Sequence, residues 1–470
     1  MVIEQIYTGC LAQGAYYIES EGIAAIIDPL RDASTYVNRA AQSEAKITHI
    51  FETHFHADFV SGHVELAEAT GATIVFGPLA NPNFTFHQAV HHEEIAIGAC
   101  AIRVLHTPGH TMESTSYLLL DADRQPHALF TGDTLFIGDV GRPDLAQKAA
   151  EITQEQLAST LFHSLRNEIM PLPASVLIYP AHGAGSACGK NISTQTWDTL
   201  ENQLATNYAL RADMSEAEFV QEVTSGLLPP PAYFPENVAL NKQHIPALSE
   251  VLKRNNLALT PDEFEAHQEI ENALILDTRS KEAFAKAHIP GSIFIGIDGN
   301  FAPWVGAMIK DVNQRMLIVS NEGTEAEVLM RLSRVGFDGA IGYLQGGIDA
   351  WLMAGKECDT LEQISATKLA AQFHSEETQL LDVRKPGEFA AEHVDGAYSI
   401  PLDFINEKMH TLDADTSYYA HCLSGYRSAI FISIMKSRGF HNIVDVQGGW
   451  NELSKTSIPT TDFVCSSKVK

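Results

Sequence analysis

Histidines and aspartates follow the ends of four strand-like runs in the first half of the chain. The runs cover residues 47–51, 102–105, 128–130 and 176–178, and the polar residues after them are His54, His56, Asp58, His110, Asp133 and His182. Imidazole and carboxylate groups are ligands of borderline divalent metals. Because side chains at the ends of neighbouring strands are held rigidly, one coordination position can stay open for chemistry. The series therefore predicts a catalytic metal site.

These motifs resemble the metallo-β-lactamase superfamily, and the resemblance covers residues 1–250. Members that hold two zinc ions usually read His-x-His-x-Asp-His. Here Phe59 follows Asp58, which removes a ligand of the second metal. The departure favours a site for a single ion.

The remaining ligands resemble those of persulfide dioxygenases. The resemblance implies one Fe(II) per chain, held by His54, His110 and Asp133. Two histidines and one carboxylate form the facial triad of non-haem iron oxygenases. Oxygen and a substrate thiolate would then bind the same ion.

Further residues are expected around this ion, as groups that orient its ligands or contact substrate. They are His56, Asp58, Asp28, Arg142, Tyr179, His182, Cys188 and Lys190. Three of them have simpler interpretations. Asp28 precedes Pro29 and suits a turn, Arg142 can pair with a nearby aspartate, and Cys188 can be an inert packed residue.

A second candidate for a reactive group lies near the other end of the chain. Cys422 follows the apolar run 417–420 and precedes the helix expected over 429–436, which places it on a strand-to-helix loop. Backbone N–H groups of such a loop stabilise an anion, so Cys422 is a candidate thiolate nucleophile. The loop from Cys422 to Arg427 resembles that of rhodanese sulfurtransferases, whose cysteine carries a persulfide sulfur. Arg427 would then stabilise the anion in the loop.

An internal repeat accounts for the middle of the chain. Leu276-Asp277-Thr-Arg279 and Leu381-Asp382-Val-Arg384 begin two similar stretches, whose later markers recur at a nearly constant offset. Both resemble rhodanese modules. The first has Asn321-Glu-Gly-Thr-Glu-Ala where the second has Cys422 to Arg427. It lacks nucleophile and arginine, so it is expected to be an inactive spacer or docking module.

Length and pattern support a three-domain α/β protein. The 470 residues are 45% hydrophobic, enough for several cores. The expected architecture is an N-terminal αββα metallo-β-lactamase sandwich over 1–250, then two rhodanese-like α/β domains over 260–356 and 364–465. Consecutive prolines within residues 227–235 mark the end of the first domain.

Charge and composition restrict the partners. The formal net charge of −28 disfavours nucleic acid and anionic membrane surfaces. The chain begins without a signal-like segment, and six irregularly spaced cysteines suit a reducing compartment. We expect a cytoplasmic homo-oligomer that meets small-molecule persulfides, O2 and sulfite.

Together the resemblances imply a fused persulfide dioxygenase–sulfurtransferase. The iron site would oxidise the persulfide of glutathione or coenzyme A to sulfite, and Cys422 would pass persulfide sulfur to sulfite, giving thiosulfate. Two alternatives stay open. One is a thioesterase like glyoxalase II, against which Phe59 counts; the other is a sulfur carrier without oxygenase activity, against which the set His54, His110 and Asp133 counts.

Overall fold

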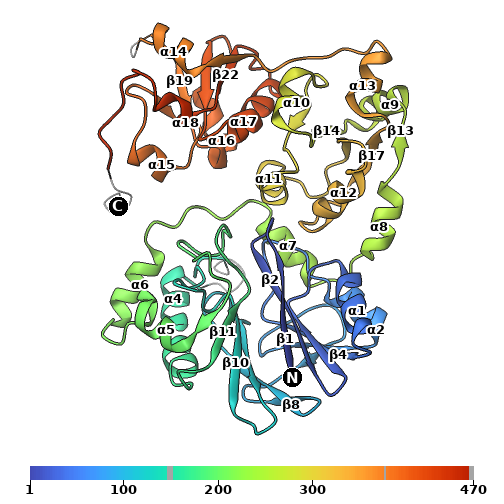
Figure 1. Ribbon diagram of the computed structural model, residues 1–470, viewed down its shortest axis with the longest axis vertical. Coiled ribbons are helices and arrows are strands. Elements are labelled where there is room, and N and C mark those ends of the chain that lie inside the picture. Colours follow the sequence, from blue (N-terminus) through green and yellow to red (C-terminus); the bar gives the residue numbers. More distant parts are fainter. Residues whose placement is uncertain (146–151, 375–376, 465–470) are drawn as a thin grey trace. The chain divides into compact units, whose positions relative to one another are not determined.

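The computed structural model describes residues 1–145, 152–374 and 377–464, and its chain divides into two compact units (Figure 1). Unit 1 comprises residues 1–250 and 333–336, and unit 2 comprises residues 251–332 and the chain from 337 onward. The expected end of the last domain, residue 465, lies outside the described residues.

Unit 1 is built on two six-stranded sheets. The first sheet has the order β1 (Val2–Thr8), β2 (Gln13–Ser20), β3 (Ile23–Ile27), β4 (Lys46–Glu52), β5 (Thr73–Phe76) and β6 (His87–Gln88). The second has the order β12 (Asp198–Thr199), β11 (Leu177–Pro180), β10 (Pro126–Gly132), β9 (Thr115–Leu120), β8 (Cys100–His106) and β7 (Glu94–Ile97). β3 and β4 run parallel, as do β10 and β11, and β8 and β10 share a direction because each is antiparallel to β9. β3 and β4 therefore end at one edge of the first sheet, and β8, β10 and β11 end at one edge of the second.

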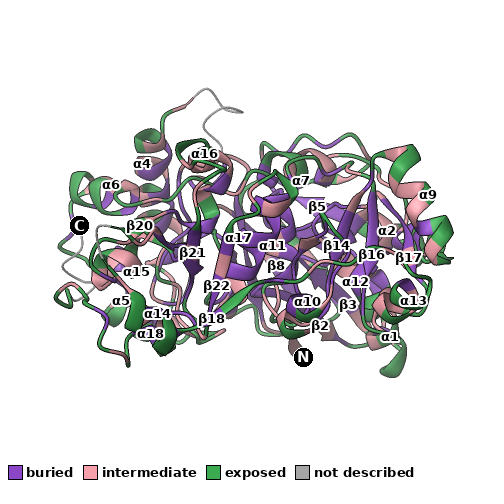
Figure 2. Cartoon of the chain, turned by 90° about the horizontal axis from the view of Figure 1, so that it is seen from above, coloured by how far each residue is buried: buried purple, intermediate pink, exposed green. Residues whose placement is uncertain are grey.

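Helices cover the outer faces of both sheets. α1 (Ala33–Gln42) and α2 (His63–Thr70) share an apolar cluster with the first sheet. The second sheet shares one with α4 (Gln154–Ser164), η1 (Leu165–Ile169), α5 (Leu200–Thr206), η2 (Tyr208–Leu210) and α6 (Glu216–Thr224). A third cluster, which includes Phe51 and Phe130, joins the facing sides of the two sheets. The expected αββα sandwich is confirmed, and Figure 2 shows inner strands such as β3 and β5 as mostly buried.

Two further helices come next: α7 (Phe234–Asn241) begins at the end of the proline-rich segment, and α8 (Leu248–Asn255) follows it. α7 begins with a proline at its second position, where the missing N–H is not needed for an intrahelical bond. Among the described helices, none combines the length and apolar character that a membrane crossing requires.

Unit 2 contains two five-stranded sheets with the same connectivity. The first has the order β13 (Ala258–Leu259), β17 (Ala340–Leu344), β16 (Met316–Val319), β14 (Leu274–Asp277) and β15 (Ile293–Phe294). The second has the order β18 (Gln363–Ser365), β22 (Ile443–Gln447), β21 (Tyr418–His421), β19 (Leu380–Asp382) and β20 (Tyr398–Ser399). All registered pairs are parallel, which requires helical crossovers.

The crossover helices are also matched between the two copies. The first copy has α9 (Pro261–Glu271), α10 (Lys281–Lys286), α11 (Phe301–Met308), α12 (Glu325–Ser333) and α13 (Gly347–Met353). The second has α14 (Ala366–Gln372), α15 (Pro386–Ala391), η3 (Leu402–Phe404), α16 (Ile405–Lys408), η4 (Met409–Thr411), α17 (Tyr426–Ser437) and α18 (Trp450–Leu453). The repeat inferred from sequence is therefore a repeat of fold.

Several element boundaries differ from those expected from the sequence, and two of the differences bear on the sites. The strand expected over 176–178 is β11 (Leu177–Pro180), so it begins one residue later and reaches closer to His182. The helix expected over 429–436 is α17, which begins at Tyr426. Gly425, with φ of 103°, turns the chain directly into this helix, so Arg427 lies in its first turn.

Candidate functional site

Three buried side chains meet where β4, β8 and β10 end. Nε2 of His110 lies 3.5 Å from Oδ2 of Asp133, and Nε2 of His54 lies 3.8 Å from the same oxygen. One potential ligand atom from each residue lies within 4.8 Å of the others. Within the described chain, Oδ2 of Asp133 has no hydrogen-bond partner although it is buried. A buried, ionised oxygen that faces two ring nitrogens fits a bound cation.

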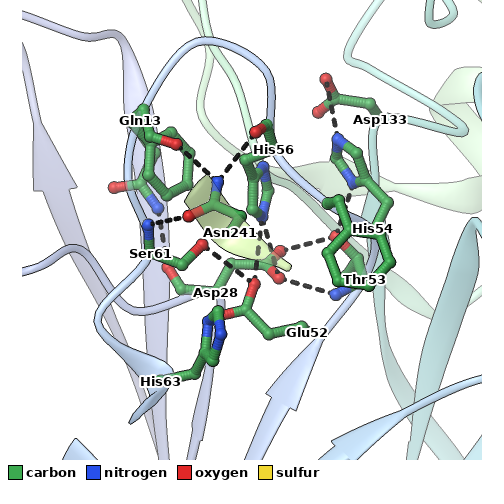
Figure 3. Close-up of polar contacts among 12 residues, drawn as sticks. Gln13, Asp28, Glu52, Thr53, His54, His56, Ser61, His63, Asp133 and Asn241 are labelled. Atoms are coloured by element: carbon green, nitrogen blue, oxygen red, sulfur yellow. Dashed lines mark hydrogen bonds and ion pairs between the residues drawn. The ribbon is translucent and has the colours of Figure 1, made fainter. Parts of the chain in front are cut away.

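The second nitrogen of each histidine has a fixed partner. Thr53 donates its hydroxyl to Asp28 Oδ2 at 2.9 Å, so the Thr53 oxygen accepts from Nδ1–H of His54 at 3.0 Å. Figure 3 shows Thr53 between Asp28 and His54. Nδ1–H of His110 donates to the backbone carbonyl of Arg142 at 2.9 Å. Both Nε2 atoms are therefore left for an ion, the usual arrangement of metal-binding histidines.

The loop after β10 passes so close to Asp133 and His110 that only glycine fits at position 141. A Cβ at Gly141 would lie 1.9 Å from the carbonyl oxygen of Asp133 and 2.9 Å from Nδ1 of His110. A larger residue would push the Arg142 carbonyl away from His110. The glycine therefore helps to orient the His110 ring.

Burial keeps the two histidines neutral. It lowers the pKa of His110 and, with the neighbouring His56, places the pKa of His54 well below its usual value. Burial opposes ionisation of Asp133, but the charge and hydrogen bond of His182 outweigh it, and the pKa of Asp133 falls far below normal. Neutral imidazoles and an ionised carboxylate are the protonation states that metal binding requires.

His182 connects two carboxylates. Its Nδ1 lies 2.7 Å from Oδ1 of Asp133 and its Nε2 lies 2.8 Å from Oδ2 of Asp58. Burial alone would lower the pKa of His182, but the two carboxylates raise it well above its usual value. The protonated ring fixes Asp133 with its other oxygen toward His54 and His110.

A second buried group lies next to the first. Nε2 of His56 lies 3.2 Å from Oδ1 of Asp28 and 3.5 Å from Oε2 of Glu52 (Figure 3). Burial and the nearby Asp28 raise the pKa of Glu52 well above normal. The Phe59 ring is fully buried and stacks on His56, with centroids 4.2 Å apart and an interplanar angle of 27°. The ring beside His56 therefore has no atom that could bind a metal ion.

The remaining residues expected at the site divide into two groups. Cys188 can form a ligand cluster with Asp58 and His182, and burial raises its pKa well above normal, so it carries a protonated thiol. The Arg142 guanidinium instead pairs with Asp144 at 2.6 and 2.7 Å, the simpler interpretation of this residue. Its contact with the site is through its backbone.

Tyr179 and Lys190 are directed elsewhere. The Tyr179 ring stacks on Phe130, with centroids 5.5 Å apart. Lys190 donates from Nζ to the carbonyl oxygens of Glu222 and Ser225.

The Cys422 loop lies in unit 2 between β21 and α17. Gly425 N–H donates to Cys422 Sγ at 3.1 Å, and the side chain of Cys422 is almost fully buried. Arg427 forms a two-pronged ion pair with Glu388, at 2.6 and 2.9 Å. Spacing along the sequence does not predict this pairing, because Glu388 and Arg427 lie 39 residues apart.

Thr53 and Glu52 were also missed by sequence reasoning. Their only sequence signal is their position directly before His54. Their roles depend on Asp28 and His56, which come from a different strand end and a later part of the loop.

Comparison with known proteins agrees with this division. Residues 8–182 match the family described as the metallo-beta-lactamase superfamily, and residues 260–354 and 365–456 each match the rhodanese-like domain. Persulfide dioxygenase ETHE1 of Bos taurus is 30% identical over 211 residues, which is 44% of this chain and 74% of that protein. The chain belongs to the persulfide dioxygenase–rhodanese fusion family.

Other relatives place this fusion protein within the superfamily. A metallo-beta-lactamase crystal structure from Staphylococcus aureus is 32% identical, covers 73% of the fusion protein and 98% of its own chain, and has a TM-score of 0.64. Hydroxyacylglutathione hydrolase of Rhodospirillum rubrum is 34% identical over 164 residues, 34% of this chain and 57% of that protein. The resemblance thus extends to a hydrolase branch.

Proposed function

We propose that this fusion protein oxidises low-molecular-weight persulfides, such as those of glutathione or coenzyme A, with O2 at one Fe(II) per chain. The product would be sulfite, and Cys422 would pass persulfide sulfur to sulfite to give thiosulfate. The observation that carries the proposal is the pair of neutral histidines, His54 and His110, facing the unpartnered oxygen of Asp133 in a chain that also holds the Cys422 loop.

The protein groups have distinct tasks in this reaction. His54, His110 and Asp133 would hold the ion, which when bound supplies O2 activation and binding of the substrate sulfur. Thr53 and the Arg142 carbonyl keep the two imidazoles in the tautomer that presents Nε2. His182 holds the proton that neutralises one side of Asp133. The Cys188 thiol, beside Asp58 and His182, is a candidate to contact substrate sulfur.

Sulfur transfer would use Cys422 as a nucleophile. The Gly425 N–H donates to its sulfur and thereby stabilises the thiolate. The Cys422 persulfide then gives its terminal sulfur to sulfite: the sulfur–sulfur bond to Cys422 breaks, a sulfur–sulfur bond to sulfite forms, and the Cys422 thiolate is regenerated. No oxidant is consumed in this step.

A thioester hydrolase is the second candidate, favoured by the identity to hydroxyacylglutathione hydrolase. The buried Phe59 counts against it, because a two-metal site would lack one ligand. Oxygen uptake with glutathione persulfide, compared with hydrolysis of a hydroxyacylglutathione, separates the two. Iron-dependent oxygen uptake with sulfite formation supports the dioxygenase, whereas thioester hydrolysis with two zinc ions per chain supports the hydrolase.

A further inference from the structure

A pocket of about 290 Å³ opens beside Cys422, and both rhodanese-like modules line it. The second module contributes Cys422, Lys385, Tyr426 and Arg427, and the first contributes Asn300 and Trp304. Both modules belong to unit 2. The copy that lacks a nucleophile therefore forms part of the wall around the other copy's nucleophile.

The contact between the modules is direct at this point. Tyr426, in the first turn of α17, donates its hydroxyl to the carbonyl of Gly296 at 2.7 Å. Lys281 Nζ donates to the carbonyl of Ser424, inside the Cys422 loop, at 2.6 Å. A Cβ at Gly299 would lie 2.3 Å from Cζ of Tyr426, so the Tyr426 ring packs directly against the Gly299 backbone.

These contacts position the start of α11. Asn300 follows Gly299 directly and precedes the helix, and Trp304 lies one turn further on. Because α11 is anchored at this end, Trp304 is held at the pocket by the same contacts that hold the Cys422 loop. The Trp304 side chain is only partly buried, so part of its ring is accessible to a molecule in the pocket.

The pocket is larger than an inorganic sulfur anion needs. Its volume of about 290 Å³ equals the space of about ten water molecules. The lining combines the aromatic rings of Trp304 and Tyr426 with the cationic Lys385 and the Arg427–Glu388 pair. An aromatic wall suits an organic body and a lysine suits an acidic group.

We propose that Trp304 and Asn300 of the inactive module determine donor specificity at Cys422, by forming the wall that receives an anionic organic persulfide. The inactive module is thus part of the sulfur-transfer site rather than a spacer. This inference rests on the proposed function only in requiring Cys422 to accept sulfur.

The sulfur transfer in this pocket is balanced without a further reactant. The Cys422 thiolate attacks the terminal sulfur of the donor RSS⁻. A new sulfur–sulfur bond forms on Cys422, the donor's sulfur–sulfur bond breaks, and RS⁻ leaves with the electron pair. Charge is conserved, since two thiolate-level anions stand on each side.

The test uses the full-length protein without oxygen, so that the iron site cannot turn over. Glutathione persulfide and thiosulfate serve as a large and a small donor, and mass spectrometry follows persulfide formation on Cys422. Trp304→Ala should raise the half-saturating concentration of glutathione persulfide about tenfold, as expected when one aromatic contact is lost. The maximal rate and the reaction with thiosulfate should stay unchanged.

Three further variants make the result specific. Trp304→Phe keeps an aromatic wall and should restore most of the affinity, and it also answers the question if Trp304→Ala fails to fold. Asn300→Ala should raise the half-saturating concentration less. Trp197→Ala removes a half-exposed tryptophan of unit 1 and should have no effect.

The outcomes separate this inference from the proposed function. The inference would be overturned if Trp304→Ala, Asn300→Ala and the unsubstituted protein had equal half-saturating concentrations of glutathione persulfide. Sulfur transfer at Cys422 would then still stand. An equal loss with both donors would also overturn it, because the wall would then not select by size. Absence of any persulfide on Cys422 in the unsubstituted protein would reject the proposed transfer itself, and the inference with it.

Discussion

Nδ1 of His182 lies 2.7 Å from Oδ1 of Asp133, which leaves Oδ2 as the carboxylate oxygen that faces His54 and His110. One carboxylate oxygen thus accepts a hydrogen bond from His182, and the other is left for an ion. A chain that only stored sulfur would have no need of this division.

Asp133→Asn should abolish iron binding and oxygen uptake, because it removes the negative charge while keeping the shape. Sulfur transfer at Cys422, which lies in the other unit, should persist. Elemental analysis, an oxygen electrode and the anaerobic Cys422 assay measure the three properties. Asp123→Asn, at an exposed turn, is the control. Loss of both activities in a folded variant would show that the sites are not separable.

Thr53→Val should weaken iron binding about 10- to 100-fold, the cost expected for losing a partner behind a metal ligand. The hydroxyl between Asp28 and His54 disappears while the shape is kept. Thr53→Ser retains the hydroxyl and should bind iron almost normally. Competition with a chelator measures the iron affinities. Equal affinities for the two variants would contradict a role for the Thr53 hydroxyl in orienting His54.

Cys422→Ser should still consume oxygen with a persulfide substrate but accumulate sulfite, with little thiosulfate formed by the protein. Serine cannot form a persulfide. Cys358→Ser, at an exposed cysteine, should behave like the unsubstituted protein. Chromatography after thiol derivatisation measures both products. Unchanged thiosulfate formation by Cys422→Ser would rule out Cys422 as the transferring nucleophile and leave Cys188 as the next candidate.

Glu388→Gln should destabilise unit 2 by about 1 kcal/mol at neutral pH, the upper range for a partly exposed ion pair. Burial raises the pKa of Glu388, but the hydrogen bond and charge of Arg427 outweigh it, so the pKa lies below normal. A lowered carboxyl pKa gives stability that is present above the unfolded pKa of about 4.3 and lost as pH falls through the folded pKa. Calorimetry from neutral to acidic pH should show the difference between the two proteins vanish. A difference that persists in acid would not come from this pair.

Asn321→Cys should not rescue Cys422→Ser. It returns a thiol to the first module, but Ala326 stands where the second module has Arg427, and Glu322 and Glu325 lie in the same loop. Nearby carboxylates disfavour a thiolate. The same product analysis applies, and restored thiosulfate would show that the loop sequence is not what inactivates the first module.

The sequence predicted the parts of the site that are local. The His54 motif, His110 and Asp133 could be placed because each follows an apolar run that forms a strand. Contacts between distant segments could not be predicted from spacing. The Arg142 carbonyl near His110 depends on how a loop folds back, and Trp304 near Cys422 depends on how two modules pack.

Boundaries were less predictable than element types for a similar reason. The start of α17 at Tyr426 follows from the conformation of Gly425, which no periodicity reveals. The pairing of Arg427 with Glu388 likewise requires α15 and α17 to be placed in the same fold.

The residues expected to hold iron come from opposite layers of the sandwich. His54 follows β4 of the first sheet, whereas His110 and Asp133 follow β8 and β10 of the second. Neither sheet alone carries a complete set, so the site comes into being only when the two layers have docked. We therefore expect iron to bind late in folding, after the two sheets have packed together. A bound ion would then oppose separation of the two sheets.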